Sequence, residues 1–232
     1  MKVHALIPAA GAGRRMGGGT SKQYLSLAGL PILAHTLTLF QKHPAIDSIV
    51  LIAPPDEIGF CREDIVAPFG FDKVTDIVAG GRERQDSVRN GLRACGADGD
   101  DIALIHDGVR PLLPPELIDA VIAVAARDGA GLVAVPAKDT IKIVRDGLVT
   151  ETPDRSALWQ AQTPQAFRFQ LIASAHEKAY KEGYQATDDA QLIEWLGLPV
   201  AIVQGSYRNL KITTPEDLLL AESFLGSDRT AR

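Results

Sequence analysis

The stretch VHALIPAAGAGRRMGGGTSK, residues 3–22, decides the fold. It begins with a short apolar run, typical of a buried β-strand, and passes without a break into a glycine-rich loop. Such a loop lets the backbone approach a ligand closely, and it is often used to bind phosphate groups. The stretch therefore predicts a phosphate site directly after the first strand.

Two familiar phosphate-binding sequence patterns match this loop in part, but neither matches it fully. The dinucleotide pattern G-x-G-x-x-G fits Gly11 and Gly13, but Met16 stands where the third glycine belongs. The pattern G-x-x-x-x-G-K-[ST] fails because Lys22 follows Ser21 instead of preceding a Ser or Thr. The loop therefore indicates a phosphate site of another kind.

The charge pattern supports a small anionic ligand. The chain carries 24 Lys and Arg against 29 Asp and Glu, a formal net charge of −5, which gives it no general attraction to nucleic acid or anionic membranes. Residues 1–45 nevertheless contain no acidic residue, while Arg14, Arg15 and Lys22 are basic. The plain alternative is a flexible surface turn with solvated charges.

Composition predicts one domain in a reducing compartment. At 232 residues and 46% hydrophobic, the chain can bury one sizeable core, or at most two small ones. Cys61 and Cys95 form no C-x-x-C or Cys/His cluster, which argues against a disulfide framework or a structural zinc site. The apolar segment before Pro8 is too short for a signal peptide, and no apolar stretch approaches the roughly 20 residues that span a bilayer. We expect a cytoplasmic protein.

Strand and helix signals alternate along the chain. Apolar, β-branched runs occur at 3–9, 48–54, 76–80, 101–107, 131–136 and 199–205, and helical periods at 31–43, 115–127, 170–182 and 188–195. A last helix is expected from Pro215, with Thr214 as N-cap and Gly226 as its end. The pattern predicts a single-domain, Rossmann-like α/β fold, with a mostly parallel sheet flanked by helices and ligands at the carboxyl ends of its strands.

Residues 138–160 break this alternation. Two alternating runs surround Asp146-Gly147, which is a strong hairpin signal. An isolated two-stranded ribbon is only marginally stable, so it must pack on its own domain or on a second subunit. We expect a single domain over 1–226, a protruding β-hairpin arm over 138–157 and a disordered tail over 227–232.

Residues that suit phosphate chemistry follow other strands. Asp107 comes directly after a buried run, with Arg110 close behind, and one carboxylate there suits Mg²⁺ that also binds substrate phosphates. The alternative for Asp107 is a helix cap or a turn. Lys211 precedes the last helix, and the glycine-rich segment 80–88 opens another helix, a place for backbone contacts to a base or ribose.

The sequence offers no activated nucleophile. There is no G-x-S-x-G motif and no cysteine in a polar motif, and a His106 that ends a strand is more often packed than catalytic. Phosphoryl or nucleotidyl transfer fits, because catalysis there depends on positioning and charge neutralisation. An attacking phosphate would be ionised already and would need no general base.

Together these motifs resemble a known family. PAAGAGRRM, SKQYL, HDGVRP, the RDG hairpin with DRSALWQAQTPQAF, TDD and NLKITTPEDL, matching in order from residue 6 to about 222, look like 2-C-methyl-D-erythritol 4-phosphate cytidylyltransferases. These are nucleotidyltransferases of glycosyltransferase-A-like fold in the non-mevalonate isoprenoid pathway. The resemblance implies transfer of CMP from CTP to methylerythritol phosphate, with Mg²⁺ and pyrophosphate release, in a homodimer that exchanges arms.

The resemblance also implies roles for individual residues. Arg15, Lys22, Arg155 and Lys211 would be catalytic, and Asp107 would bind Mg²⁺. The nucleotide would be bound by Ala9, Ala10, Gly11, Gly13, Gly81, Arg82 and Ser87, and the acceptor by Arg110, Thr140, Arg155, Thr163, Thr187 and Lys211. Gly108-Val109 and Gln191 depart from commoner family residues, which bears on fine specificity and not on the reaction.

Three other functions remain open on the sequence. A cytidylyltransferase acting on ribitol 5-phosphate would share the loop and the aspartate. An NAD-binding oxidoreductase is disfavoured by Met16 and by the missing acidic residue about 20 positions past the glycines. A nucleotide-sensing module without catalysis would have no need for Arg15, Lys22, Asp107 and Lys211 together.

Overall fold

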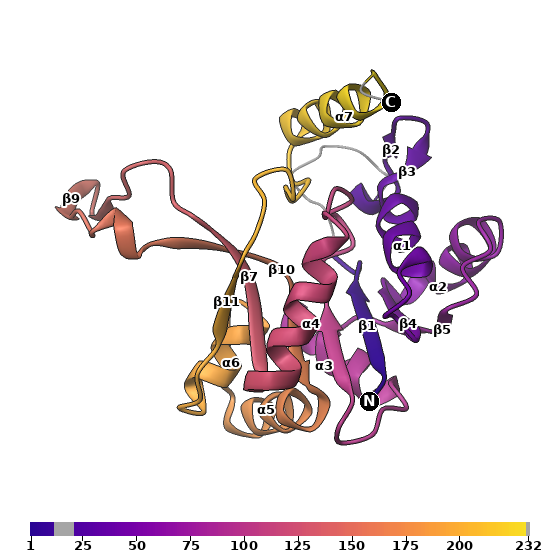
Figure 1. Ribbon diagram of the computed structural model, residues 1–232, viewed down its shortest axis with the longest axis horizontal. Coiled ribbons are helices and arrows are strands. Elements are labelled where there is room, and N and C mark those ends of the chain that lie inside the picture. Colours follow the sequence, from indigo (N-terminus) through magenta and orange to yellow (C-terminus); the bar gives the residue numbers. More distant parts are fainter. Residues whose placement is uncertain (12–20, 231–232) are drawn as a thin grey trace.

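A seven-stranded sheet forms the centre of the computed structural model, which describes residues 1–11 and 21–230, with side chains through Gly226 (Figure 1). The strand order is β11-β7-β10-β6-β1-β4-β5. The strands are β1 (Val3–Pro8), β4 (Ser48–Ala53), β5 (Val74–Ala79), β6 (Ile102–Ile105), β7 (Ala130–Pro136), β10 (Trp159–Arg168) and β11 (Ala201–Gln204). Each of the six expected runs contains a strand, and the mostly parallel α/β sheet is confirmed.

The strand β10 was not expected. It runs antiparallel between β6 and β7, with a register shift between Ala161 and Gln165. Its sequence, WQAQTPQAFR, is rich in polar residues, and Gln162, Thr163 and Gln165 are buried all the same. Polar side chains inside the sheet hide the apolar pattern by which a buried strand is normally found.

Helices cover both faces of the sheet and bury alternate residues of its strands (Figure 1). One core packs α1 (Ile32–Lys42) and α4 (Glu116–Asp128) on Ala5 and Ile7 of β1. The other core packs α3 (Arg84–Ala94), α5 (Phe169–Glu182) and α6 (Asp189–Trp195) on the opposite face, which includes Leu6. This two-sided burial explains why the strands read as continuous apolar runs.

Shorter elements complete the first core. The short α2 (Ile58–Phe60) continues into a turn of π-helix, Cys61–Val66, whose Cys61 is buried. Cys61 and Cys95 are both free thiols. None of the helices in the described ranges is long and apolar enough to cross a bilayer.

The last helix is longer than expected. Helix α7 (Pro215–Thr230) has the expected N-cap, because the Asp217 N–H donates to Thr214 Oγ1 at 3.3 Å while the Asp217 carboxylate accepts from the Thr214 N–H. The helix continues past Gly226 to Thr230, so the expected end at Gly226 is wrong, while a disordered tail stays a prediction; residues 231–232 lie outside the described residues. An interior glycine costs a helix only about 1 kcal/mol, and no proline follows to stop it.

The arm is a hairpin, as predicted. Strands β8 (Ile143–Arg145) and β9 (Leu148–Glu151) are joined by Asp146 and Gly147, whose φ angles of 49° and 78° make a two-residue turn with positive φ at both positions. The arm projects from the body of the molecule (Figure 1), and all residues of both strands are exposed, Leu148 to 72%. An apolar ribbon exposed in this way lacks a core of its own.

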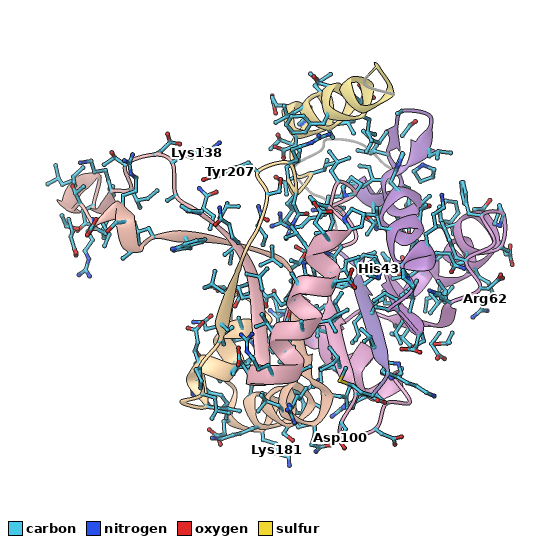
Figure 2. The ribbon with its side chains drawn as sticks, in the orientation of Figure 1. His43, Arg62, Asp100, Lys138, Lys181 and Tyr207 are labelled. Atoms are coloured by element: carbon cyan, nitrogen blue, oxygen red, sulfur yellow. The ribbon has the colours of Figure 1, made fainter. Side chains whose placement is uncertain are left out.

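The base of the arm is fixed to the domain. Tyr207 donates its hydroxyl to the Pro136 carbonyl at 2.7 Å, and Lys138 Nζ lies 3.5 Å from the centre of the Tyr207 ring (Figure 2). Arg155, in a 3-10 turn (Arg155–Ala157), donates to the Lys138 carbonyl at 2.8 Å. These contacts fix the direction in which the ribbon leaves.

The connections of the sheet create a crevice. From β1 the chain adds β4 and β5 on one side, then returns to place β6 on the other side of β1. The strand order therefore reverses at β1, and parallel α/β sheets bind ligands at such a reversal.

Candidate functional site

A cavity of about 430 Å³ lies at this reversal. Segments that are far apart in the sequence line it, namely those that follow β1, β5 and β6 and the segment before α7. The lining residues are Pro8, Ala9, Ala10, Gly11, Lys22, Gln23, Gly81, Arg82, Glu83, Arg84, Ser87, Asp107, Val109 and Lys211.

Most of the expected nucleotide-binding and catalytic positions meet in this cavity. Nine of them line it: Ala9, Ala10, Gly11, Lys22, Gly81, Arg82, Ser87, Asp107 and Lys211. Gly13 and Arg15 lie outside the described residues. Gly11 at the start of the glycine-rich loop, Asp107 and Lys211 before the last helix thus line one cavity.

The segment between β5 and α3 forms one wall, built from backbone and small side chains. The Gly81 N–H donates to Ser87 Oγ at 3.0 Å, and Ser87 Oγ donates to the Glu83 carbonyl at 3.0 Å. A Cβ on Gly80 would clash with the Cβ of Ala10, so only glycine lets this segment approach the loop after β1. Glu83 and Asp86 cap the start of α3 reciprocally, which holds the wall in place.

Asp107 is the electrostatic centre of the site. Its Oδ1 accepts from Arg84 Nε at 3.1 Å, while its Oδ2 lies 2.9 Å from Lys211 Nζ and 3.7 Å from Arg110 Nε. Burial alone would raise the pKa of Asp107, but the three cations hold it below its ordinary value. The carboxylate is therefore ionised throughout the physiological pH range.

This donor set fits a divalent cation that arrives with a nucleotide. In the described ranges no cluster of three or more His, Cys, Asp or Glu residues could hold a metal by itself. Mg²⁺ commonly takes one or two carboxylates together with substrate phosphates, and Asp107 supplies one carboxylate at the cavity wall.

Arg110 and Thr163 support Asp107 from behind the cavity. The backbone N–H of Asp107 donates to Thr163 Oγ1 at 3.0 Å, and Arg110 Nη1 donates to the Asn209 carbonyl at 2.6 Å. Thr163 Oγ1 is also 3.2 Å from Nδ1 of His106. Burial lowers the pKa of His106 to about 4, so its ring is neutral and suits a structural role.

The remaining expected acceptor-binding residues lie outside this cavity of the same chain. Thr140 and Arg155 are exposed on the arm and at its base. Thr187 is exposed before α6, where its hydroxyl donates to Gln191 Oε1 at 3.1 Å. The described part of the chain thus assembles this cavity without the arm.

Gln23 and Arg84 are two of the cavity residues that were not predicted. Gln23 is 1% exposed, and its amide nitrogen and oxygen have no hydrogen-bond partner among the described residues. Arg84 bridges Asp107 and Asp189. Both stand inside motifs that the sequence already singles out, SKQYL and GGRERQDSV, but without a charge pattern or spacing that assigns them a role.

The site suits charge neutralisation and not nucleophilic attack by the protein. Its walls offer backbone N–H groups, lysine and arginine cations and two carboxylates, of which Glu83 caps α3 and Asp107 faces the cations. Such a set binds phosphate groups and stabilises charge that develops on them.

Comparisons with known proteins agree with this geometry. The sequence model of the family described as 2-C-methyl-D-erythritol 4-phosphate cytidylyltransferase matches residues 3–227. A protein of that name from Syntrophotalea carbinolica is 60% identical over 97% of both chains, and one from Geotalea uraniireducens is 57% identical over 100% of both. The crystal structure of 4-diphosphocytidyl-2C-methyl-D-erythritol synthase from Anaerococcus prevotii is similar with a TM-score of 0.82 at 34% identity, covering 97% of this chain and 96% of that chain.

Proposed function

Because the chain belongs to the 2-C-methyl-D-erythritol 4-phosphate cytidylyltransferase family, we propose that it transfers CMP from CTP to 2-C-methyl-D-erythritol 4-phosphate. A phosphate oxygen of the acceptor attacks the α-phosphorus of CTP. The bond from that phosphorus to the bridging oxygen breaks, giving 4-diphosphocytidyl-2-C-methyl-D-erythritol and pyrophosphate. The observation that carries the proposal is the cavity in which Asp107 and Lys211 face the loop after β1.

The cavity supplies what the nucleotide needs. The backbone around Gly81 and Ser87 forms a wall that suits the cytidine, and the loop after β1 suits the phosphates. Lys22 and Lys211 stabilise the negative charge that grows in the transition state, and Arg15 acts with them. Asp107 would hold Mg²⁺ together with the phosphates, and the ion would supply neutralisation of the triphosphate charge.

The acceptor is bound between two subunits. Arg110, Thr163 and Thr187 come from one chain, and Thr140 and Arg155 of the partner subunit reach the acceptor phosphate through the arm. The exposed apolar residues of the arm, such as Val144 and Leu148, support a homodimer, since a ribbon without a core needs a second surface. The dimer acts in the cytoplasm.

The experiment is pyrophosphate release from each nucleoside triphosphate with each acceptor. We expect turnover with CTP and methylerythritol phosphate, little with UTP, ATP or GTP, and dependence on Mg²⁺. Turnover only with CTP and ribitol 5-phosphate would replace the acceptor and keep the reaction. Oxidation of NADH without pyrophosphate release would overturn the class of enzyme.

A further inference from the structure

Arg84 connects the cavity to a second, buried carboxylate. Its Nε donates to Asp107 Oδ1 at 3.1 Å, and its Nη1 donates to Asp189 Oδ2 at 2.6 Å. The guanidinium is thus fixed at two points by carboxylates on opposite sides. Although burial lowers it, these two carboxylates raise the pKa of Arg84 above its ordinary value.

Asp189 lies behind the cavity and takes no part in its lining. Its side chain is 1% exposed, and its other oxygen, Oδ1, lies 3.1 Å from Nε2 of the buried His176. These contacts connect His176 on α5, Asp189 at the start of α6 and Arg84 at the start of α3 to Asp107. They join helices of one core to the ends of the strands.

The two carboxylate oxygens of Asp107 have different partners. Oδ1 accepts from Arg84, whose position Asp189 fixes, while Oδ2 lies beside Lys211, Arg110 and the cavity. Without Asp189, Arg84 would keep its charge but lose its second point of attachment, and the carboxylate of Asp107 could rotate.

We infer that Asp189 and Arg84 are positioning residues, which hold Asp107 so that Oδ2 faces the nucleotide-bound divalent cation. The inference deepens the proposed function and rests on it. Partners that orient a metal ligand from behind typically change metal affinity by about 10–100-fold when they are replaced. Asp189 should therefore matter to the response of the site to Mg²⁺, although it touches neither cation nor nucleotide.

The test is calorimetric titration of CTP, without acceptor, in the presence and absence of Mg²⁺. We expect Mg²⁺ to strengthen CTP binding to the unmodified protein. In Asp189→Asn this enhancement should fall about tenfold or more, while metal-free binding of CTP stays within threefold. In Asp107→Asn the enhancement should vanish, and adding Asp189→Asn to that variant should change nothing further, because Asp189 acts through Asp107.

The chain contains a matched control pair. His4 and Asp101 form another buried His–Asp contact, with Nε2 and Oδ2 3.2 Å apart, at the opposite end of β6. Asp101→Asn should lower the thermal midpoint and leave the Mg²⁺ enhancement intact. This separates positioning from a general loss of stability.

If the Asp189→Asn protein does not fold, Arg84→Lys provides a second test of the inference. Lysine keeps a cation beside Asp189 but cannot span both carboxylates, so the Mg²⁺ enhancement should again fall. A folded Asp189→Asn or Arg84→Lys protein that keeps the full enhancement would overturn the inference while the proposed function stands. An unmodified protein that binds no CTP would overturn the proposed function and this inference with it.

Discussion

Gln23 shows how a single residue can serve a ligand at a cost to the free protein. Its amide is buried at the cavity wall, and within residues 1–11 and 21–226 neither amide atom has a hydrogen-bond partner. An unpaired buried polar group costs about 1–3 kcal/mol. A bound nucleotide or its hydrated cation would remove that cost, which makes the residue a source of affinity.

Gln23→Met should therefore have two opposite effects. Methionine fills the same space without unpaired polar atoms, so we expect the thermal midpoint to rise by about 2–4 °C per kcal/mol recovered. Binding of CTP with Mg²⁺ should weaken by about tenfold, since the amide no longer pairs with the ligand. Differential scanning fluorimetry and calorimetry measure the two. A lower midpoint with unchanged affinity would show that the amide is already satisfied in the free protein.

At this scale the sequence predicted residues that meet in the cavity, but not the contact of Arg84 with two carboxylates. Lys22, Asp107 and Lys211 stand in motifs whose chemistry is readable, and the cavity brings them together. Arg84 and Asp189 could not be predicted, because a guanidinium between two carboxylates depends on where α3 and α6 pack. No local pattern records that distance.

At the scale of elements, β6 has a carboxylate at each end with a different task. Asp107 follows it at the cavity, and Asp101 precedes it, accepting from the Lys2 N–H at 2.6 Å and the Asp98 N–H at 2.9 Å. Asp101 thereby joins the starts of β1 and β6, far from the site. These backbone N–H donors, with His4, lower the pKa of Asp101 to about 2.

This shift predicts part of the acid sensitivity of the protein. The pKa of Asp101 is lower in the folded state than its ordinary value of 3.8. Its contribution to the free energy of unfolding is therefore complete above about pH 4 and disappears as the pH falls through about 2. Asp101→Asn should therefore be less stable than the unmodified protein at neutral pH and should lose less stability on acidification. Urea unfolding of both proteins between about pH 4 and pH 2 measures this difference in stability.

Asp100→Asn is the control, since Asp100 is adjacent in sequence and exposed (Figure 2). It should keep the pH dependence of the unmodified protein. Parallel acid profiles for the unmodified protein and Asp101→Asn would mean that other carboxylates account for the whole effect.

Among the elements, those with a regular apolar period were predictable and β10 was not. Helices α1 and α4 and strands β1 and β4 bury continuous or periodic apolar residues. In β10 the buried Gln162, Thr163 and Gln165 supply hydrogen bonds, with Thr163 accepting from Asp107 N–H, so its pattern reflects the site and not the core. The length of α7 was missed for a simpler reason, because one glycine does not end a helix.

At the scale of the whole molecule, the arm determines whether one chain holds a complete site. In the described structure Arg155 contacts Lys138 at the base of the arm and is not part of the cavity. If the arm crosses to a partner, each site combines Lys22 of one chain with Arg155 of the other.

Mixing two inactive variants tests this arrangement. Lys22→Ala should lose about 10²–10³-fold in kcat, because it removes a group that stabilises the transition state, and Arg155→Ala should lose acceptor binding. After subunit exchange, about half of the dimers are mixed and each has one intact site, so roughly a quarter of the unmodified activity should return. Activity that stays at background, with exchange confirmed by mass spectrometry, would show that each arm serves its own subunit.

The position of β10 has a consequence for how the chain is synthesised. Strands β6 and β7 leave the ribosome before β10, which must return from the arm and insert between them. Until Arg168 has emerged, the nascent sheet has two unpaired edges in its interior in addition to its outer ones, and such edges recruit other chains. A premature stop codon within the arm would therefore leave an incomplete polypeptide in which the facing edges of β6 and β7 stay unpaired. Such a polypeptide would be degraded or would aggregate.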